Sequence, residues 1–262
     1  MHKLDKNNHR QQTMNIIKLL KNHKSVRSYK PDHIDPELLN SILDAGCRAS
    51  TTGNMQLYSI IVTSDENKKA ELAPAHFNQK AVLEAPILLT ICADFNRFNK
   101  WCLHRDAVPG FGNFLSFMNG AIDAILVSQN ICVAAESVGL GICYFGTVLY
   151  NADVIIEKLM LPNGVIPVAA ITLGYPAVVP TQTDRLSLDA IVHKEVYTDY
   201  TPERINKIYS TKEAQSDNVK FVIENNKKTL AQVFTDVRYK KGDNEHFSAK
   251  LLDVLKKQGF LS

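Results

Sequence analysis

One long helical stretch at residues 113–138 constrains this chain more than any other feature, because its central part is apolar almost all round. A helix of that kind is buried on every side, either in a large core or against a partner subunit. Its longest apolar run, at residues 121–133, is short for a bilayer-spanning segment and carries Asp123, Ser128, Gln129 and Asn130. The sequence therefore predicts a globular protein built around a buried helix, with no membrane-spanning segment.

Composition agrees with a globular protein. The chain has 262 residues, of which 45% are hydrophobic and 22% charged, which is enough apolar material for a sizeable core. Its formal net charge of +3 gives no reason to expect a nucleic-acid partner, and acidic residues interleave with the basic ones near the C-terminus. The polar residues 1–15 lack the apolar core of a signal peptide, so we expect a cytoplasmic protein.

The five cysteines are scattered, with no C-x-x-C pair and no metal-ligand spacing with histidine. In a mostly apolar context they predict buried, reduced thiols and no metal site. Cys102, close to Trp101 and His104, is the one candidate for a reactive thiol. Single histidines such as His76 are expected at the surface or at the edge of the core rather than as ligands.

Strand and helix signals alternate along the first two thirds of the chain. Asp35 followed by Pro36 predicts the start of a helix, because an Asp N-cap and a Pro in the first turn are typical of helix N-termini. The sequence favours strands at 57–63, 86–92, 142–146 and 165–175, and helices at 13–22, 65–73 and from about 151 to 161. Strands separated by helices indicate an α/β or α+β core.

Three parts of the chain are expected. Residues 1–14 would form a flexible tail, and residues 15–200 the core. Residues 201–262 would form a helical extension, with helices near 202–209, 217–236 and 244–258, packed on the core or on a partner subunit. The sequence shows no internal repeat.

Two polar segments have the composition of a ligand site. The first, His23-Lys24-Ser25-Val26-Arg27, places three basic groups and a hydroxyl in five residues, which suits a phosphate group. A solvated basic helix end is its simpler interpretation. The second, residues 50–56, joins small polar side chains with Gly53 and could approach a planar ligand closely, although it could also be an ordinary helix-to-strand loop.

Two further segments contain glycine near a strand. The segment Gly139–Thr147 has the glycine spacing of a dinucleotide-binding loop, but a helix precedes it and a strand follows, the reverse of that motif. We therefore expect Gly139 and Gly141 to end the long helix, and Gly146 to lie where a strand ends. The last segment, residues 174–176 followed by Arg185, is uninformative alone.

Taken together and in this order, these segments resemble the nitroreductase/flavin reductase superfamily, in particular its NADPH-dependent, oxygen-insensitive nitroreductases. The resemblance covers residues 15–200 and has six motifs: H-K-S-V-R at 23–27, A-S-T-T-G-N-M-Q at 49–56, N-Q-K at 78–80, A-A-E-S-V-G-L-G at 134–141, Y-F-G at 144–146, and L-G-Y-P at 173–176 followed by Arg185. It implies an α+β sandwich with a mixed central sheet flanked by helices. It also implies an interlocked homodimer that holds FMN at the subunit interface.

The resemblance assigns a role to each motif residue. His23, Lys24 and Ser25, with Arg185, would hold the phosphate and ribityl end of FMN, and Arg27 would lie near the pyrimidine edge of the flavin. The remaining flavin contacts would come from Thr52, Gln79, Tyr144, Phe145, Gly146 and Thr147. Arg27 and the backbone N–H near Gly146, which would face flavin N5, are the expected catalytic groups.

The implied activity is reduction of nitroaromatics, quinones or free flavin with NADPH or NADH, by ping-pong hydride transfer to a small-molecule acceptor. Alternatives are a non-enzymatic flavin-binding protein and another reaction on the same scaffold. The chain departs from its relatives at Lys24 in place of Arg, Thr183 in place of Lys, Thr147 in place of Gly and Leu149 in place of a basic residue. A less cationic phosphate site follows from these changes.

Overall fold

The computed structural model describes residues 15–261, so the tail expected at residues 1–14 lies outside the described residues. The chain divides into two compact units. The first extends to Thr181 and resumes at Leu251, and the second is Gln182–Lys250. The expected division into a core at residues 15–200 and a helical extension at 201–262 stays a prediction.

A four-stranded sheet forms the centre of the first unit, with the order β1-β2-β4-β3 and antiparallel pairing between all neighbours. The strands are β1 (Tyr58–Thr63), β2 (Ile87–Asp94), β3 (Gly141–Phe145) and β4 (Val165–Gly174). All four strand predictions are confirmed within a few residues. The parallel pairing of the expected mixed sheet is present, among the described residues, as a single bridge between Ser25 and Ile142.

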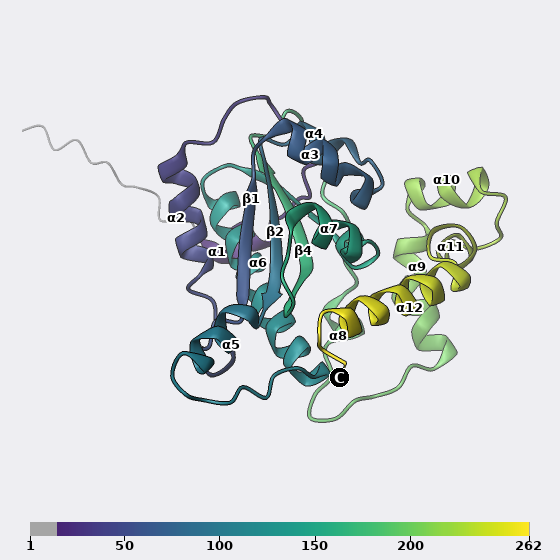
Figure 1. Cartoon of the computed structure of the whole chain (residues 1–262). Coiled ribbons are helices and arrows are strands. Elements are labelled where there is room, and N and C mark those ends of the chain that lie inside the picture. The colour runs from purple at the N-terminus through teal and green to yellow at the C-terminus, as the bar shows by residue number, and fades with distance from the viewer. Residues whose placement is uncertain (1–14, 262) are drawn as a thin grey trace, which may run out of the picture. The chain divides into compact units, whose positions relative to one another are not determined.

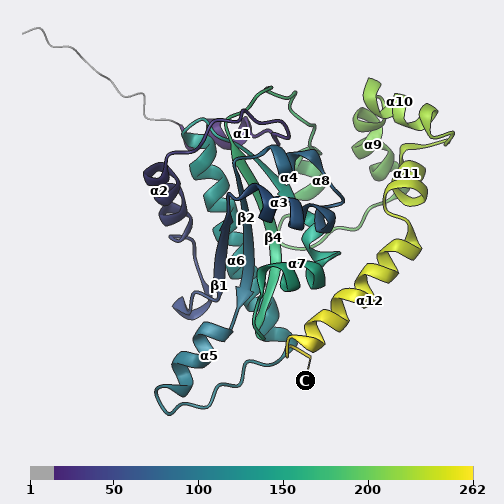
Figure 2. The same cartoon turned by 45° about the horizontal axis from the view of Figure 1, so that its top comes forward.

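Helices cover both faces of this sheet (Figures 1 and 2). One face packs on α6 (Phe114–Ser137), which in turn contacts α2 (Pro36–Gly46). On the other face lie α3 (Glu66–Leu72), α4 (Lys80–Glu84) and α7 (Ala152–Leu159). Alternate residues of β2 serve the two layers, since Leu89 and Ile91 belong to the larger core cluster and Leu88 to the smaller one. The fold is therefore α+β, as expected.

The long apolar helix is confirmed as α6, but it is not buried on every side. Its inner face is fully buried, with Ala124, Val127 and Ile131 in the core. Its outer face leaves Leu115, Ile122 and other apolar side chains exposed. Length and hydropathy alone would let α6 cross a membrane, although the apolar run within it was expected to be too short. Its contacts with the sheet and the fully buried Asp123 in its middle instead mark the central helix of a packed core.

Local sequence signals explain several helix ends. Asp35 caps α2, because its carboxylate accepts hydrogen bonds from the backbone N–H groups of Glu37 and Leu38. Gly139 follows α6 with φ +84°, as predicted, whereas Gly141 is already part of β3. Gly141 is there because Val26 packs against it: an added Cβ would lie 2.6 Å from Val26 Cγ2.

The other described elements are short helices. In the first unit these are α1 (Ile16–Lys21), α5 (Asn96–Leu103) and the turns η1 (Thr52–Asn54), η2 (Ala73–His76) and η3 (Gly146–Leu149). The second unit is helical, with α8 (Leu188–Ile191), α9 (Pro202–Glu213), α10 (Ser216–Glu224), α11 (Leu230–Val233) and the π-helical turn η4 (Phe234–Arg238). Helix α12 (Lys241–Lys257) begins in this unit. The expected helix at 217–236 is thus broken into separate pieces.

Candidate functional site

The basic segment at residues 23–27 runs beside β3. The backbone N–H of Val26 donates to the carbonyl of Ile142 over 2.8 Å, and Ser25 forms the parallel bridge to the same residue. The ring of His23 is held from α6, since its Nδ1 lies 2.7 Å from Glu136 Oε1. The sheet edge and the C-terminal end of α6 therefore fix this segment on both sides.

Arg27 extends from that segment toward the thiol of Cys143 in β3. The guanidinium lowers the pKa of this thiol and burial raises it, and burial has the larger effect, so the pKa of Cys143 lies above its usual value. Arg27 itself remains exposed. A permanent cation thus lies at the edge of the sheet, next to the strand that leads to Gly146.

The end of β3 presents an open backbone surface. A Cβ added at Gly146 would meet no heavy atom within 4 Å, and Gly146 is exposed. Phe145 is buried in the smaller core cluster, so only its backbone can reach a ligand on this surface. Tyr144 points the other way, with its hydroxyl against Ser128 and Cys132 of α6. Of the four expected ring contacts, Gly146 is the one whose surroundings are most open.

His76 joins this surface to the segment that carries Gln79. Its Nδ1 lies 2.9 Å from Thr147 Oγ1, and its ring packs edge-on against Phe145 with the ring centres 5.5 Å apart. The side chain is fully buried, so the expectation of a surface or core-edge histidine is wrong. Burial lowers the pKa of His76 to about 4 and keeps the ring neutral. Gln79 follows three residues later, exposed at the start of α4.

Thr52 is anchored to the middle of α6. Both its backbone N–H and its hydroxyl donate to Asp123 Oδ1, over 2.8 and 2.9 Å, and the N–H of Leu57 donates to Asp123 Oδ2 over 3.1 Å. This one buried carboxylate closes the 52–57 loop at both ends. In a protein interior a carboxylate is stable only with such partners.

The two groups of expected contact residues lie at different levels of α6. Glu136, the partner of His23, comes thirteen residues after Asp123, the partner of Thr52. At a rise of 1.5 Å per residue these positions are about 20 Å apart along the helix.

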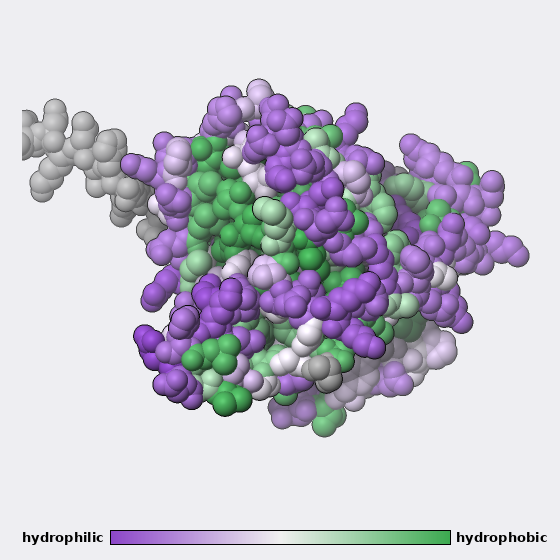
Figure 3. Space-filling model, viewed as in Figure 1, coloured by the Kyte–Doolittle hydropathy of each residue, from purple (hydrophilic) through white to green (hydrophobic). Residues whose placement is uncertain are grey.

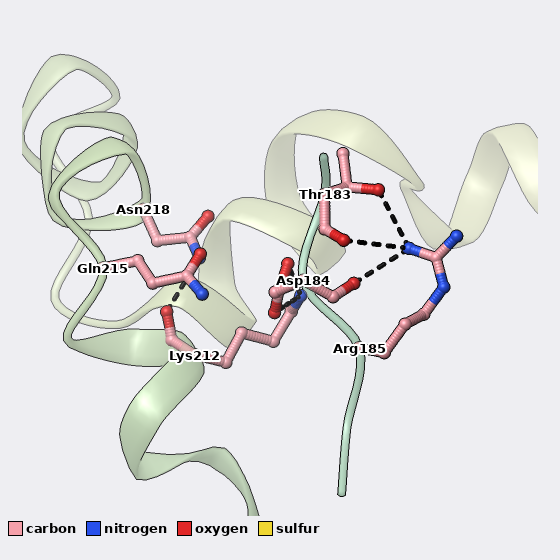
Figure 4. A network of polar contacts seen from close by, with 6 residues as sticks. All are labelled: Thr183, Asp184, Arg185, Lys212, Gln215 and Asn218. Carbon is pink, nitrogen blue, oxygen red and sulfur yellow. Dashed lines mark hydrogen bonds and ion pairs between the residues drawn. The ribbon is translucent and has the colours of Figure 1, made fainter. Parts of the chain in front are cut away.

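Arg185 belongs to the second unit, whose internal contacts are drawn in Figure 4. Its Nη1 donates to the hydroxyl of Thr183 and to the carbonyl of Asp184, each over 2.9 Å. Asp184 pairs with Lys212 of α9, with 3.0 Å between Lys212 Nζ and Oδ2. Thr183 thus helps to orient the guanidinium of Arg185. That Arg185 binds the same FMN phosphate as residues 23–27 stays a prediction.

Four residues that support these segments were not identified as site residues from the sequence: His76, Arg97, Asp123 and Glu136. Asp123 had a signal, because it is an acidic residue in an apolar helix. Glu136 lies within the motif at residues 134–141 but was given no role, and His76 and Arg97 had no signal, since their partners lie far away along the chain. Cys47 also departs from expectation: it is exposed, whereas the other four cysteines are buried and all five are free.

Comparisons with known proteins identify the class. The model of the Nitroreductase family matches residues 20–175, and the chain belongs to this family. A curated relative from Bacillus subtilis, named FMN reductase (NADPH), is 34% identical over 191 residues, which cover 70% of this chain and 74% of that protein. The oxygen-insensitive NADPH nitroreductase of Salmonella typhimurium is 34% identical over 181 residues, covering 69% and 74%.

A solved structure from Bacteroides fragilis extends the similarity to nearly the whole chain. It is 53% identical, with a TM-score of 0.93, and it covers 94% of this chain and all of that one. The family fold expected from the six motifs is therefore confirmed.

Proposed function

We propose that this protein is an FMN-dependent oxidoreductase that takes electrons from NADPH or NADH and reduces small molecules. The observation that carries the proposal is the alignment of the 23–27 segment with β3, which places cationic and hydroxyl groups beside the strand that leads to Gly146. Family membership supports it, and the named relatives are reductases, which favours an enzyme over a passive flavin-binding protein.

The described residues fit FMN chemically. Lys24 and Ser25 offer a cation and a hydroxyl for a phosphate, and Arg27 offers a fixed charge beside them. The open surface at Gly146 leaves room for a flat ring above the backbone. When bound, FMN supplies the redox chemistry by accepting and returning a hydride equivalent.

The protein's own groups then act by binding and orientation. Arg27 places a permanent positive charge where the resemblance puts the pyrimidine edge of the flavin, and preorganised charge of this kind favours electron uptake. The neutral His76 holds the Thr147 hydroxyl and keeps the end of β3 in place. No side-chain nucleophile is required. Because donor and acceptor would use one face of the ring in turn, we expect ping-pong kinetics.

We further propose that the site is completed by a second copy of the chain. The 52–57 loop is anchored about 20 Å along α6 from the His23 anchor, so a second subunit would supply one of these two groups to each flavin. An exposed apolar stripe on α6 offers a surface for a homodimer: Leu115, Met118, Ile122, Ile125 and Leu126. Apolar side chains also gather over β1 beside α2 (Figure 3), where Val62 is 43% exposed.

The acceptor would be a nitroaromatic, a quinone or free flavin, and the site of action the cytoplasm. An absorption spectrum of the purified protein tests the cofactor, and oxidation of NADPH or NADH with menadione tests the activity. We expect flavin bands at about one FMN per chain and steady turnover. A colourless protein that cannot be reconstituted with FMN would contradict the proposal.

Two substitutions test the assigned residues. Arg185→Ala should weaken FMN binding by about 1.5–3 kcal/mol, because a charge-assisted phosphate contact is lost. Unchanged retention of FMN on dilution would remove Arg185 from the site. Arg27→Ala should slow flavin reduction in stopped flow more than it weakens FMN binding, and an unchanged rate would count against its catalytic role.

A further inference from the structure

A hollow of about 560 Å³ lies between the 53–55 loop and α5, within the first unit. It is lined by Gly53, Asn54, Met55, Arg97, Phe98 and Trp101. None of the motifs that carry the family resemblance includes α5, and no role has been given to these side chains. The hollow adjoins Thr52, the loop residue that is expected to contact the flavin.

The loop side of the hollow is held in an unfavourable backbone conformation. Gly53, Asn54 and Gln56 all have φ of +55° to +56°, the left-handed region that glycine and asparagine tolerate and that is unfavourable for Gln56. Such a conformation persists only where neighbouring groups enforce it, and it is common at ligand sites. Here Asp123 fixes the loop from α6, and Arg97 fixes it from α5 by donating to the carbonyls of Gln56 and Tyr58. The loop is therefore preorganised before any ligand arrives.

The opposite side of the hollow is aromatic. Phe98 and Trp101 lie on α5 with ring centres 5.4 Å apart, and 56% of Trp101 is exposed. With the thioether of Met55 they offer polarisable surfaces to a flat ring. Arg97 adds a permanent positive charge to a lining that contains no acidic residue; Asp94, which accepts from the backbone N–H of Arg97, does not line the hollow.

We propose that this hollow binds the electron acceptor, and that it selects planar aromatic acceptors that carry an anionic group, such as a carboxylate. The ring would stack on Trp101 and Phe98, with the anion toward Arg97. The proposal rests on the oxidoreductase function above and adds a binding site to it, with no new chemical step. Thr52 is the first residue of the loop that lines the hollow, and it is a predicted flavin contact. An acceptor bound in the hollow would therefore lie beside the flavin.

Trp101 makes binding directly observable, because it is the only tryptophan of the chain. The oxidised, FMN-loaded protein is titrated with 4-nitrobenzoate in the absence of NADPH, so that no turnover occurs, and tryptophan fluorescence is recorded. We expect saturable quenching, with half-saturation at a several-fold lower concentration than for the uncharged analogue 4-nitrobenzyl alcohol. Quenching that rises linearly, with the slope found for free N-acetyltryptophanamide, would overturn the proposal.

A nucleotide offers similar chemistry, an aromatic base with anionic phosphates, and NADP⁺ is therefore titrated in parallel. Saturable quenching by 4-nitrobenzoate supports an acceptor site, with or without competition from NADP⁺, because donor and acceptor would use one face of the flavin in turn. Saturable quenching by NADP⁺ alone assigns the hollow to the nucleotide and overturns the proposal.

Substitutions give an independent measurement. Trp101→Leu should raise KM for 4-nitrobenzoate about tenfold, whereas Leu103→Ala is the control, because Leu103 is 63% exposed on the same helix and does not line the hollow. Arg97→Gln keeps an N–H donor for the loop but removes the charge, and it should abolish the preference for the carboxylate over the alcohol. An unchanged KM in Trp101→Leu would contradict the proposal.

Failure of the general function gives a different result. A protein that binds no FMN, or does not oxidise NADPH with menadione, loses the oxidoreductase assignment. Failure of the further inference alone would leave a protein that binds FMN and oxidises NADPH with menadione, but whose Trp101 fluorescence shows no saturable quenching by 4-nitrobenzoate.

Discussion

The buried carboxylate of Asp123 provides the sharpest test of how the site is held. It is fully buried and accepts three hydrogen bonds, two from Thr52 and one from the backbone of Leu57. In Asp123→Asn the amide oxygen can keep both Thr52 donors, but the NH₂ group then faces the N–H of Leu57. The charge-assisted bond from Leu57 is lost, and its N–H is left facing another donor. The two bonds from Thr52 remain but no longer reach a charged acceptor.

The expected cost follows from these contacts. A hydrogen bond to a charged group contributes about 1.5–3 kcal/mol, and a buried donor without a partner costs about 1–3 kcal/mol. We therefore expect Asp123→Asn to lower the free energy of unfolding by about 3 kcal/mol. Thr52→Val, which removes only the hydroxyl bond to this carboxylate, should cost about 1.5 kcal/mol, the lower end of that range, because Thr52 is only partly buried.

The assay is urea unfolding followed by far-UV circular dichroism, with FMN at one fixed concentration. Asp35→Asn is the matched control, because the exposed Asp35 also accepts two backbone N–H bonds and Asn caps helices as well as Asp does. The reasoning is refuted if Asp123→Asn unfolds within about 0.5 kcal/mol of that control, which is the range of ordinary surface substitutions.

Three further predictions concern other parts of the first unit. Burial lowers the pKa of His76 from 6.5 to about 4. Between these two values the unfolded chain binds a proton at this ring and the folded chain does not. The free energy of unfolding should therefore fall by about 2 kcal/mol between pH 7.5 and pH 5. Urea unfolding of His76→Gln should lack that loss, and equal slopes in both proteins would disprove it. Ile122→Glu puts a charge on the apolar stripe of α6 and should yield a monomer by light scattering, whereas a stable dimer would exclude this face. Gly141→Ala should force Val26 away from β3 and weaken FMN binding in a fluorescence titration, while Gly110→Ala, where an added Cβ meets no atom within 4 Å, should not; equal affinities would show that the 23–27 segment adapts.

Much of the fold was predictable because its determinants are local. The apolar, β-branched runs predicted all four strands, and the Asp35 cap with Pro36 predicted the start of α2. α5 was missed, because it is short and polar on average and no cap marks its start. The break between α10 and α11 was missed although local residues mark it: Asn226 has a positive φ, and the Thr229 side chain caps the start of α11.

For the candidate site, too, the sequence indicated some parts and only the structure showed the others. Sequence order and residue type picked out the segments at 23–27, 50–56, 78–80 and 144–147, because phosphate and flavin binding demand particular side chains at close spacing. Their supports came only from the structure: Glu136 behind His23, His76 behind Thr147, and Asp123 behind Thr52. These contacts join residues 71 to 113 positions apart.

By itself the sequence predicted the four strands, the long helix and the family, because these depend on neighbours along the chain. Tertiary structure decided which faces of α6 are covered, that the 52–57 loop and the 23–27 segment lie at different levels of that helix, and that α5 closes a hollow beside the loop. Burial and pairing between distant residues depend on how the layers pack, and no local pattern encodes that packing.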